Sequence, residues 1–236
     1  MQKATPAHNA HPRRRTNEGA ENYAKALYEL QARGETAVGT NAVAERLGVT
    51  PASASGMLKR LADDGVVEYT RYHGARLTPE GERIALEVIR HHRLIELFLA
   101  EVLEMPWDRV HTEAEVLEHH ISEELEELIA VKLGQPMLDP HGDPIPDRDL
   151  AVSADDSVPL TELDPGESAI FARVSDHDAS MLRFLTEREI QPGDRLLVRS
   201  REPFGGPSMV EVAGRTHSLG PQLAGSMRVR REESRE

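Results

Sequence analysis

The first hydrophobic pattern in the chain is helical. Apolar residues recur every three or four positions over residues 23–30, which predicts an amphipathic helix that ends near Gly34. Two shorter helices are expected over residues 40–47 and 51–64, with Thr50 placed to cap the second. Two short helices joined by a Gly-Val-Thr turn are typical of a helix-turn-helix.

After these helices the pattern changes to that of a β-hairpin. Residues 66–69 and 71–77 form two β-like runs with a turn at Gly74, and a hairpin in this place is the wing of a winged helix. The helix over residues 51–64 would then read DNA, because its outward side chains are small near its N-terminus and basic further along. The candidate DNA-contacting residues are Thr50, Pro51, Ala52, Ser53, Ser55, Lys59, Arg60, Arg71 and Arg76.

A long helix is expected next. Thr78 and Pro79 form a strong helix start, and the apolar positions continue to Leu103 on more than one face, which favours a dimer interface. Asp108 could cap the following helix, and Ser122 starts one more helix, which Gly134 ends.

The last third of the chain differs in character. Residues rich in Pro, Asp and Ser precede β-like runs over 168–174, 195–200, 208–212 and 227–230, with one amphipathic helix near 179–189. Several short strands with Gly and Pro turns predict a small barrel.

These patterns predict a mainly α protein with a small β domain. The expected parts are a disordered tail over residues 1–19, a winged helix over 20–78, a helical domain over 79–135, a linker over 136–165 and a β domain over 166–232.

Composition adds several limits. The chain of 236 residues contains no cysteine, which excludes disulfides and thiolate metal sites. No long apolar run is present, so we expect a cytoplasmic protein without a membrane partner. The net charge is -13, yet residues 1–80 hold 11 Lys and Arg against 9 Asp and Glu. This asymmetry fits a DNA-binding head on an acidic body.

One stretch carries candidate metal chemistry. If residues 111–119 are helical, then His111, Glu115, Glu118 and His119 share a face about 100° wide, with Val116, Leu117 and Ile121 left to pack on the other side. His92 and Glu96 are spaced one turn apart on the preceding helix, and paired helices can collect metal ligands. A solvated acidic face is the alternative interpretation. Oxygen and imidazole ligands favour Mn(II) or Fe(II) over structural zinc.

The order of these elements resembles the diphtheria toxin repressor family of metal-dependent transcriptional regulators, from about residue 20 onward. The motifs that carry the resemblance are the winged helix, Leu-Thr-Pro-Glu-Gly from residue 77, His-Arg-Leu-x-Glu at 92–96, the stretch 111–119, and Pro-His-Gly-x-Pro-Ile-Pro from residue 140. The resemblance implies that the β domain is similar to an SH3-like (FeoA-like) barrel.

The resemblance also implies two metal sites. One would use His92, Glu96 and His111, and the other would use Glu115, Glu118 and His119 with Asn22 from the first helix. Iron-type members carry a cysteine where this chain has Glu115, so the hard ligand favours Mn(II). Manganese-type members carry carboxylates on the first helix, where this chain has Asn22 and Lys25, and an ammonium group cannot ligate. Asp176, His177 and Asp178 lie near where the family offers extra ligands; His120, His141, His177 and His217 are read as structural or surface residues.

The implied function is metal-dependent repression by a homodimer. Bound Mn(II), or Fe(II), would act as corepressor, hold two reading helices at the spacing of an inverted-repeat operator in double-stranded DNA, and so repress metal-uptake genes. One alternative is a winged-helix regulator without metal. A metallohydrolase is a remote alternative, because the chain has no His-Glu-x-x-His motif, nucleophile elbow or phosphate loop.

Overall fold

A computed structural model describes residues 17–32, 34 and 36–232, and the chain divides into a unit of residues 1–85 and a unit of residues 86–236. Most of the tail expected over residues 1–19 lies outside the described residues. The described part begins with Asn17, whose side chain caps a helix that starts at Glu18, before the expected domain boundary at residue 20.

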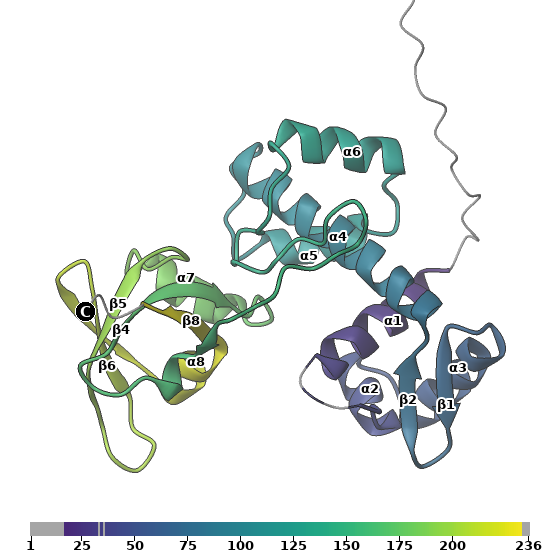
Figure 1. Ribbon diagram of the computed structural model, residues 1–236, viewed down its shortest axis with the longest axis horizontal. Helices are drawn as coiled ribbons and strands as arrows, with labels where there is room; N and C mark the ends of the chain where they lie inside the picture. The colour runs from purple at the N-terminus through teal and green to yellow at the C-terminus, as the bar shows by residue number, and fades with distance from the viewer. Residues whose placement is uncertain (1–16, 33, 35, 233–236) are drawn as a thin grey trace, which may run out of the picture. The chain divides into compact units, whose positions relative to one another are not determined.

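The first unit is a winged helix, as the sequence predicts (Figure 1). Thr50 caps the third helix by accepting a hydrogen bond from the Ser53 amide at 3.1 Å, with Pro51 at its first position. The two strands pair in an antiparallel hairpin. The elements are α1 (Glu18–Gln31), α2 (Thr40–Arg46), α3 (Pro51–Asp63), β1 (Val67–Thr70) and β2 (Gly74–Leu77).

The core of this unit holds the reading helix α3 in place. Leu58 and Leu61 of α3 and Leu27 of α1 are buried in the same apolar cluster. Gly74 opens β2 at φ +96°, and a Cβ there would lie 2.6 Å from the Val38 carbonyl oxygen, so only glycine fits this turn. The apolar interior therefore fixes which face of α3 points outward.

Three helices continue the chain: α4 (Pro79–Glu101), α5 (Val110–Leu117) and α6 (Glu123–Lys132). Ser122 caps α6 as expected, accepting a hydrogen bond from the Leu125 amide at 3.2 Å. The cap expected at Asp108 is wrong: Arg109 occupies the N-cap position of α5, and Asp108 instead pairs with Arg183 at 3.3 Å.

Helix α5 is also shorter than expected. It ends at Leu117, so Glu118 and His119 lie in the turn just beyond it, and the single ridge over residues 111–119 is not formed by one continuous helix. Val116 and Leu117, which were expected to pack, are exposed, whereas Ile121 packs partly against the core beside Val110.

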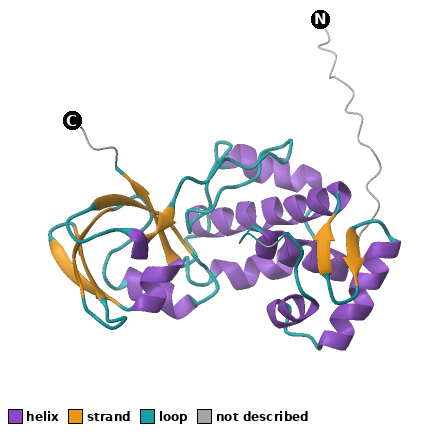
Figure 2. Cartoon of the chain, turned by 60° about the horizontal axis from the view of Figure 1, so that its bottom comes forward, coloured by secondary structure: helices purple, strands orange, loops and turns teal. Residues whose placement is uncertain are grey.

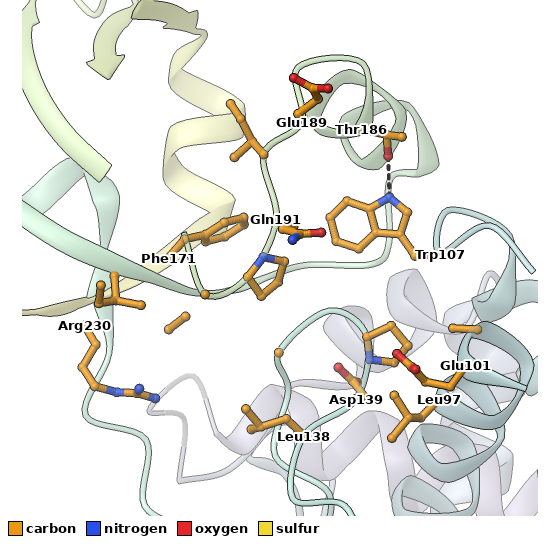
Figure 3. A pocket seen from close by; sticks show the side chains of 18 residues that line it. Leu97, Glu101, Trp107, Leu138, Asp139, Phe171, Thr186, Glu189, Gln191 and Arg230 are labelled. Atoms are coloured by element: carbon orange, nitrogen blue, oxygen red, sulfur yellow. Dashed lines mark hydrogen bonds between the residues drawn. The ribbon is translucent and has the colours of Figure 1, made fainter. Parts of the chain in front are cut away.

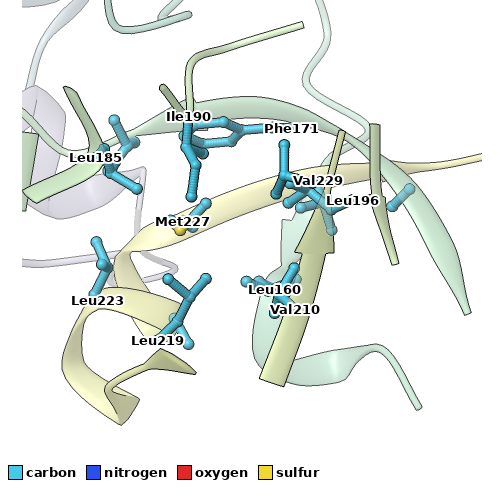
Figure 4. Packing of buried hydrophobic residues seen from close by; sticks show 14 of the residues in the cluster. Leu160, Phe171, Leu185, Ile190, Leu196, Val210, Leu219, Leu223, Met227 and Val229 are labelled. Carbon is cyan, nitrogen blue, oxygen red and sulfur yellow. The ribbon is translucent and has the colours of Figure 1, made fainter. Parts of the chain in front are cut away.

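The C-terminal part is a curled antiparallel sheet with strand order β3-β8-β4-β5-β6-β7 (Figure 2). Its inward residues, among them Phe171, Leu196 and Val229, form one apolar core (Figure 4). Strands β3 and β7 and helix α8 were not predicted; β7 reads Arg-Thr-His-Ser-Leu, and of these residues only Leu219 is buried. The elements are β3 (Val158–Pro159), the 3-10 turn η1 (Leu160–Glu162), β4 (Ser168–Val174), α7 (Ala179–Thr186), β5 (Arg195–Arg201), β6 (Ser208–Val212), β7 (Arg215–Leu219), α8 (Pro221–Ser226) and β8 (Met227–Arg231).

The helices of the described residues were compared with the length and apolarity that a membrane span requires. None of them is both long and apolar enough to cross a bilayer.

Candidate metal centre

Four separate segments of the second unit bring ligand-type side chains to one place. On α4, His92 and Glu96 are one turn apart and buried, and His92 Nε2 lies 2.9 Å from Glu96 Oε1. His111 of α5 joins them, with its Nδ1 atom 3.3 Å from Glu96 Oε1 and 3.1 Å from His92 Nε2. The structure thus brings together three residues that the sequence assigned to one site.

Asp176 completes this group. It follows strand β4 by two residues, and its Oδ2 atom lies 2.9 Å from His111 Nδ1. Side-chain ligand atoms of His92, Glu96, His111 and Asp176 all lie within 4.8 Å of one another. Of its neighbours, His177 lies with Nδ1 3.2 Å from the other oxygen of Asp176 and with its ring edge-on to His111 at 6.0 Å, and Asp178 caps α7.

A tight loop supplies two residues that the sequence did not place in a site. Asp139 and His141 are buried, and their ligand atoms lie within 4.8 Å of those of Glu96. The His141 carbonyl accepts a hydrogen bond from the Val174 amide of β4 at 3.0 Å. Gly142 has φ +89°, and a Cβ there would lie 2.0 Å from the Ala172 carbonyl oxygen, so glycine permits this close approach to β4.

A second group surrounds Glu118. His92 Nδ1 contacts Glu118 Oε2, and these two residues form a potential metal-binding group with Glu115. Glu118 is buried, whereas the Glu115 side chain is 41% exposed. His119 Nε2 lies 3.5 Å from Glu118 Oε1, beside this group rather than inside it. His92 therefore belongs to both groups.

Asn22, the ligand expected from the first helix, lies on α1 in the other unit and is partly buried. Its place in the second site stays a prediction.

The charges of the buried group are strongly coupled. Burial would raise the pKa of Glu96, but the imidazoles of His92, His111 and His141 around its carboxylate hold it well below its usual value. Against the effect of burial, Asp176 and Glu96 raise the pKa of His111 to about 10. Glu96 and Asp139 likewise raise that of His141 to about 9. Burial, with the neighbouring Asp143 and Glu96, raises the pKa of Asp139 to about 8. The centre thus holds protons at neutral pH.

Two buried atoms of the centre have no hydrogen-bond partner among the described residues: Glu96 Oε2 and His141 Nδ1, which are 3.7 Å apart. His141 Nε2 donates to the Trp107 carbonyl at 2.9 Å, so a cation that displaced the Nδ1 proton would meet the Nδ1 lone pair beside Glu96. A buried acceptor atom without a hydrogen-bond partner destabilises the fold unless a proton or a cation binds to it. The donor set of imidazole and carboxylate therefore fits a hard or borderline divalent cation.

Polar side chains of α4 and α6 hold the backbone at Glu118 in place. His91 Nδ1 donates to the Glu118 carbonyl at 3.1 Å, and His91 Nε2 lies 2.9 Å from the Glu126 carboxylate of α6. Arg90 pairs with the same carboxylate at 2.5 Å and donates to the Pro146 carbonyl at 2.6 Å. This network fixes the turn after α5 to α4 and α6.

A cleft borders the centre within the second unit (Figure 3). Leu97 and Glu101 of α4 line one side, and Thr186 and residues 189–193 line the other. Trp107 spans it, with Nε1 donating to Thr186 Oγ1 at 2.6 Å (Figure 3). Asp139 belongs both to the lining and to the buried group, so it stands between the cleft and Glu96.

The DNA-contact candidates lie in the first unit. Thr50, Pro51, Ala52 and Ser53 form the exposed start of α3, Ser55 is partly exposed, and Lys59 and Arg60 are exposed further along the helix. The two wing arginines differ: Arg76 pairs with Glu68 at 2.6 Å, and the Arg71 guanidinium lies 4.9 Å from the centre of the Tyr72 ring.

Sequence reasoning missed Asp139 and His141 as members of the buried group. The available signal was local: the two residues flank a proline and precede a glycine within Asp-Pro-His-Gly. That spacing predicts a tight turn that can direct two ligands to one point, but it does not show which segment the turn approaches.

Comparisons with known proteins match most of the chain. Three family models match: the iron dependent repressor N-terminal DNA binding domain over residues 15–75, the iron dependent repressor metal binding and dimerisation domain over 78–147, and the FeoA domain over 158–231.

Individual relatives agree with these matches. The chain is 31% identical to the iron-dependent repressor IdeR of Mycobacterium tuberculosis over 221 residues, covering 89% of this chain and 95% of the relative. It is 34% identical to the diphtheria toxin repressor of Corynebacterium diphtheriae over 145 residues, covering 61% of this chain and 64% of the relative. Among solved structures, a manganese-dependent transcriptional repressor in complex with manganese is 38% identical, with a TM-score of 0.85 over 90% of this chain and 100% of that one.

Proposed function

The chain belongs to the diphtheria toxin repressor family of metal-dependent regulators, and on that premise we propose that it is a transcriptional repressor that binds DNA when Mn(II), or alternatively Fe(II), is bound. The relatives are transcriptional repressors rather than enzymes, which leaves the metallohydrolase alternative without support. A repressor of this kind acts on chromosomal DNA, so we infer a cytoplasmic location.

The observation that carries the proposal is the buried charge cluster around Glu96. A protein without a metal has little reason to gather three carboxylates and three imidazoles, most of them buried, from four segments at one place, with Glu96 Oε2 and His141 Nδ1 lacking partners among the described residues. This favours the metal-dependent regulator over a winged-helix regulator whose acids and histidines are merely solvated. The ligand-type side chains of the cluster offer only oxygen and nitrogen donors, which favours Mn(II).

We assign the ligands to two adjoining sites. His92, Glu96, His111 and Asp176 would hold one cation, with Asp139 and His141 beside Glu96. Glu115, Glu118 and His119 would hold the other, with Asn22 as the ligand from the first unit. A bound divalent cation would supply the positive charge that lets these carboxylates share one centre.

Residues around the second site would link a bound cation to the position of helix α1. Glu118 is held by His91 through its carbonyl, so its carboxylate stays directed toward His92. Asn22 has only a weak amide oxygen to offer, and it would be drawn to the second site only once the repulsion between Glu115 and Glu118 is relieved. Helix α1, and with it the reading helix α3 of the same apolar core, would thereby take a fixed position.

A second copy of the chain is part of this proposal. Apolar side chains remain exposed on the helical part of the second unit, which matches a family model described as a metal binding and dimerisation domain. In a homodimer two reading helices would face successive major grooves, about 34 Å apart or a multiple of this, and so match an inverted-repeat operator. Metal-uptake genes are the expected targets, because repression at high metal closes a feedback loop. The exposed apolar residues are Val116 and Leu117 of α5, and Leu125, Leu128 and Val131 of α6.

The test is a mobility-shift titration of the Glu118→Ala, His119→Ala double variant against Mn(II). Removing a buried carboxylate and its neighbouring imidazole should abolish the stimulation of DNA binding by Mn(II). Glu113→Ala is the matched control, since it removes an exposed acid from α5. If the double variant keeps full stimulation, the assignment of this site is wrong.

A further inference from the structure

Three hydroxyl groups from separate segments of the first unit meet beside the reading helix. The Tyr69 hydroxyl, on strand β1, lies 3.1 Å from Ser55 Oγ of α3 and 3.5 Å from Thr40 Oγ1 at the start of α2. All three residues are partly exposed. Each hydroxyl could hydrogen-bond water at no cost, so their convergence is not explained by the needs of folding.

Positive charge surrounds this hydroxyl cluster. Lys59 lies one turn after Ser55 on α3, and Arg71 lies two residues after Tyr69; both are exposed. The pKa of the Tyr69 phenol is lowered, mainly by hydrogen bonds with Ser55 and Thr40. The charges of Lys59 and Arg71 lower it further. The potential at the phenol oxygen therefore favours negative charge.

The acidic neighbour of Tyr69 is directed elsewhere. Glu68 precedes it on β1, so its side chain points to the opposite face of the hairpin, where it pairs with Arg76 across the strands at 2.6 Å. The face that carries Tyr69 thus presents hydroxyl donors and basic side chains, which is the chemistry that binds an oxyanion.

We propose that Thr40, Ser55 and Tyr69, flanked by Lys59 and Arg71, form a binding site for one backbone phosphate of the DNA. The proposal rests on the proposed DNA-binding function and adds Thr40 and Tyr69 to its contacts. A phosphate held jointly by α2, α3 and the wing would fix the depth and register of α3 in the major groove without reading sequence.

The first experiment compares Tyr69→Phe with the full wild-type chain. The probe is a duplex selected from a random-sequence pool in the presence of Mn(II), and binding is followed by fluorescence anisotropy at saturating Mn(II). Loss of a hydroxyl donor to a charged oxygen should weaken binding about tenfold. The loss should be equal for selected and random duplexes, because phosphate contacts carry no sequence information.

Tyr72→Phe is the matched control, since it removes a tyrosine hydroxyl from the exposed turn of the same hairpin and should leave the affinity unchanged. Thermal unfolding of both variants shows whether the fold is retained. Equal affinities of Tyr69→Phe and wild type would overturn the proposal.

A second experiment separates a phosphate contact from a brace inside the protein. Single phosphates of the duplex are replaced in turn by uncharged methylphosphonates. At one position in each half-site the replacement should weaken wild-type binding but have little further effect on Tyr69→Phe, because the two changes remove the same contact. Additive losses at every position would show that Tyr69 only braces the wing, and would contradict the proposal. If wild type does not bind any duplex in Mn(II), it is the proposed function that fails.

Discussion

The reading surface and the metal centre place their charges in opposite ways. Helix α3 and the wing keep charged side chains at the surface around an apolar core, as with Lys59 and Arg60 outside Leu58. The helical part of the second unit instead buries Glu96 and Glu118 among histidines. A surface charge is solvated whether or not a ligand is bound, whereas a buried cluster is satisfied only by protons or a cation. The difference indicates that the second unit senses and the first unit reads.

The largest effect expected from this contrast is a loss of stability when a cavity is made in the apolar core of the first unit. Leu58→Ala should lower the free energy of unfolding by about 2–5 kcal/mol, because Leu58 is fully buried in α3. Urea denaturation measures the loss. The affinity of the folded protein for Mn(II) at the site of His92, Glu96, His111 and Asp176 should not change, since all four residues lie in the other unit. A parallel loss of affinity at that site would show that it depends on the core of the first unit.

Removing one buried charge of the metal centre should instead lower the affinity for Mn(II). Glu96→Gln keeps the volume of the side chain but takes the shared carboxylate from His92, His111 and His141, so Mn(II) affinity should fall by more than about 100-fold. Calorimetry on chelator-treated protein gives the affinity. The control is Glu101→Gln, an exposed acid on the same helix. Similar affinities for both variants would remove Glu96 from the centre.

The buried region should also respond to pH. In the metal-free protein the pKa values of His111 and His141 are raised to about 10 and about 9, so both are protonated at neutral pH and must release protons to ligate. Mn(II) affinity should therefore rise between about pH 6 and pH 8, about tenfold per pH unit for each proton displaced. Calorimetry in buffers of different ionisation enthalpy counts those protons. A flat affinity over this range would contradict the raised pKa values.

The smallest effect concerns a surface charge. Arg76→Ala breaks an exposed ion pair with Glu68, whose side chains are 60% and 59% exposed, so unfolding free energy should change by less than about 1 kcal/mol. If Arg76 contacts DNA, operator affinity should still fall, and the salt dependence of binding should weaken. Anisotropy titrations at several salt concentrations measure both. A large loss of stability would mean that wing charges are structural.

The same contrast explains what could be predicted from the sequence. The winged helix follows from neighbouring residues, because Thr50, Pro51 and the apolar spacing of α3 act within a few positions. His92 with Glu96, and His111 with Glu115, could be chosen because each pair is spaced one helical turn apart.

The rest of the centre depends on contacts between distant segments. Asp139 and His141 enter it because Gly142 lets their loop approach β4, and Asp176 enters because β4 ends beside His111. No local pattern encodes either approach. Helix α5 ends earlier than its periodicity suggests, which moves Glu118 and His119 into a turn; there His91 contacts the Glu118 carbonyl.

The most direct test measures the effect of Mn(II) on DNA binding and the effect of DNA on Mn(II) binding. Operator affinity of the wild-type chain is measured in chelator and in saturating Mn(II), and Mn(II) affinity is measured with and without operator DNA. If the buried centre controls the reading helices, Mn(II) should tighten DNA binding by about 5- to 150-fold, and DNA should tighten Mn(II) binding by the same factor. Operator affinity that is the same in chelator and in Mn(II) would contradict the account.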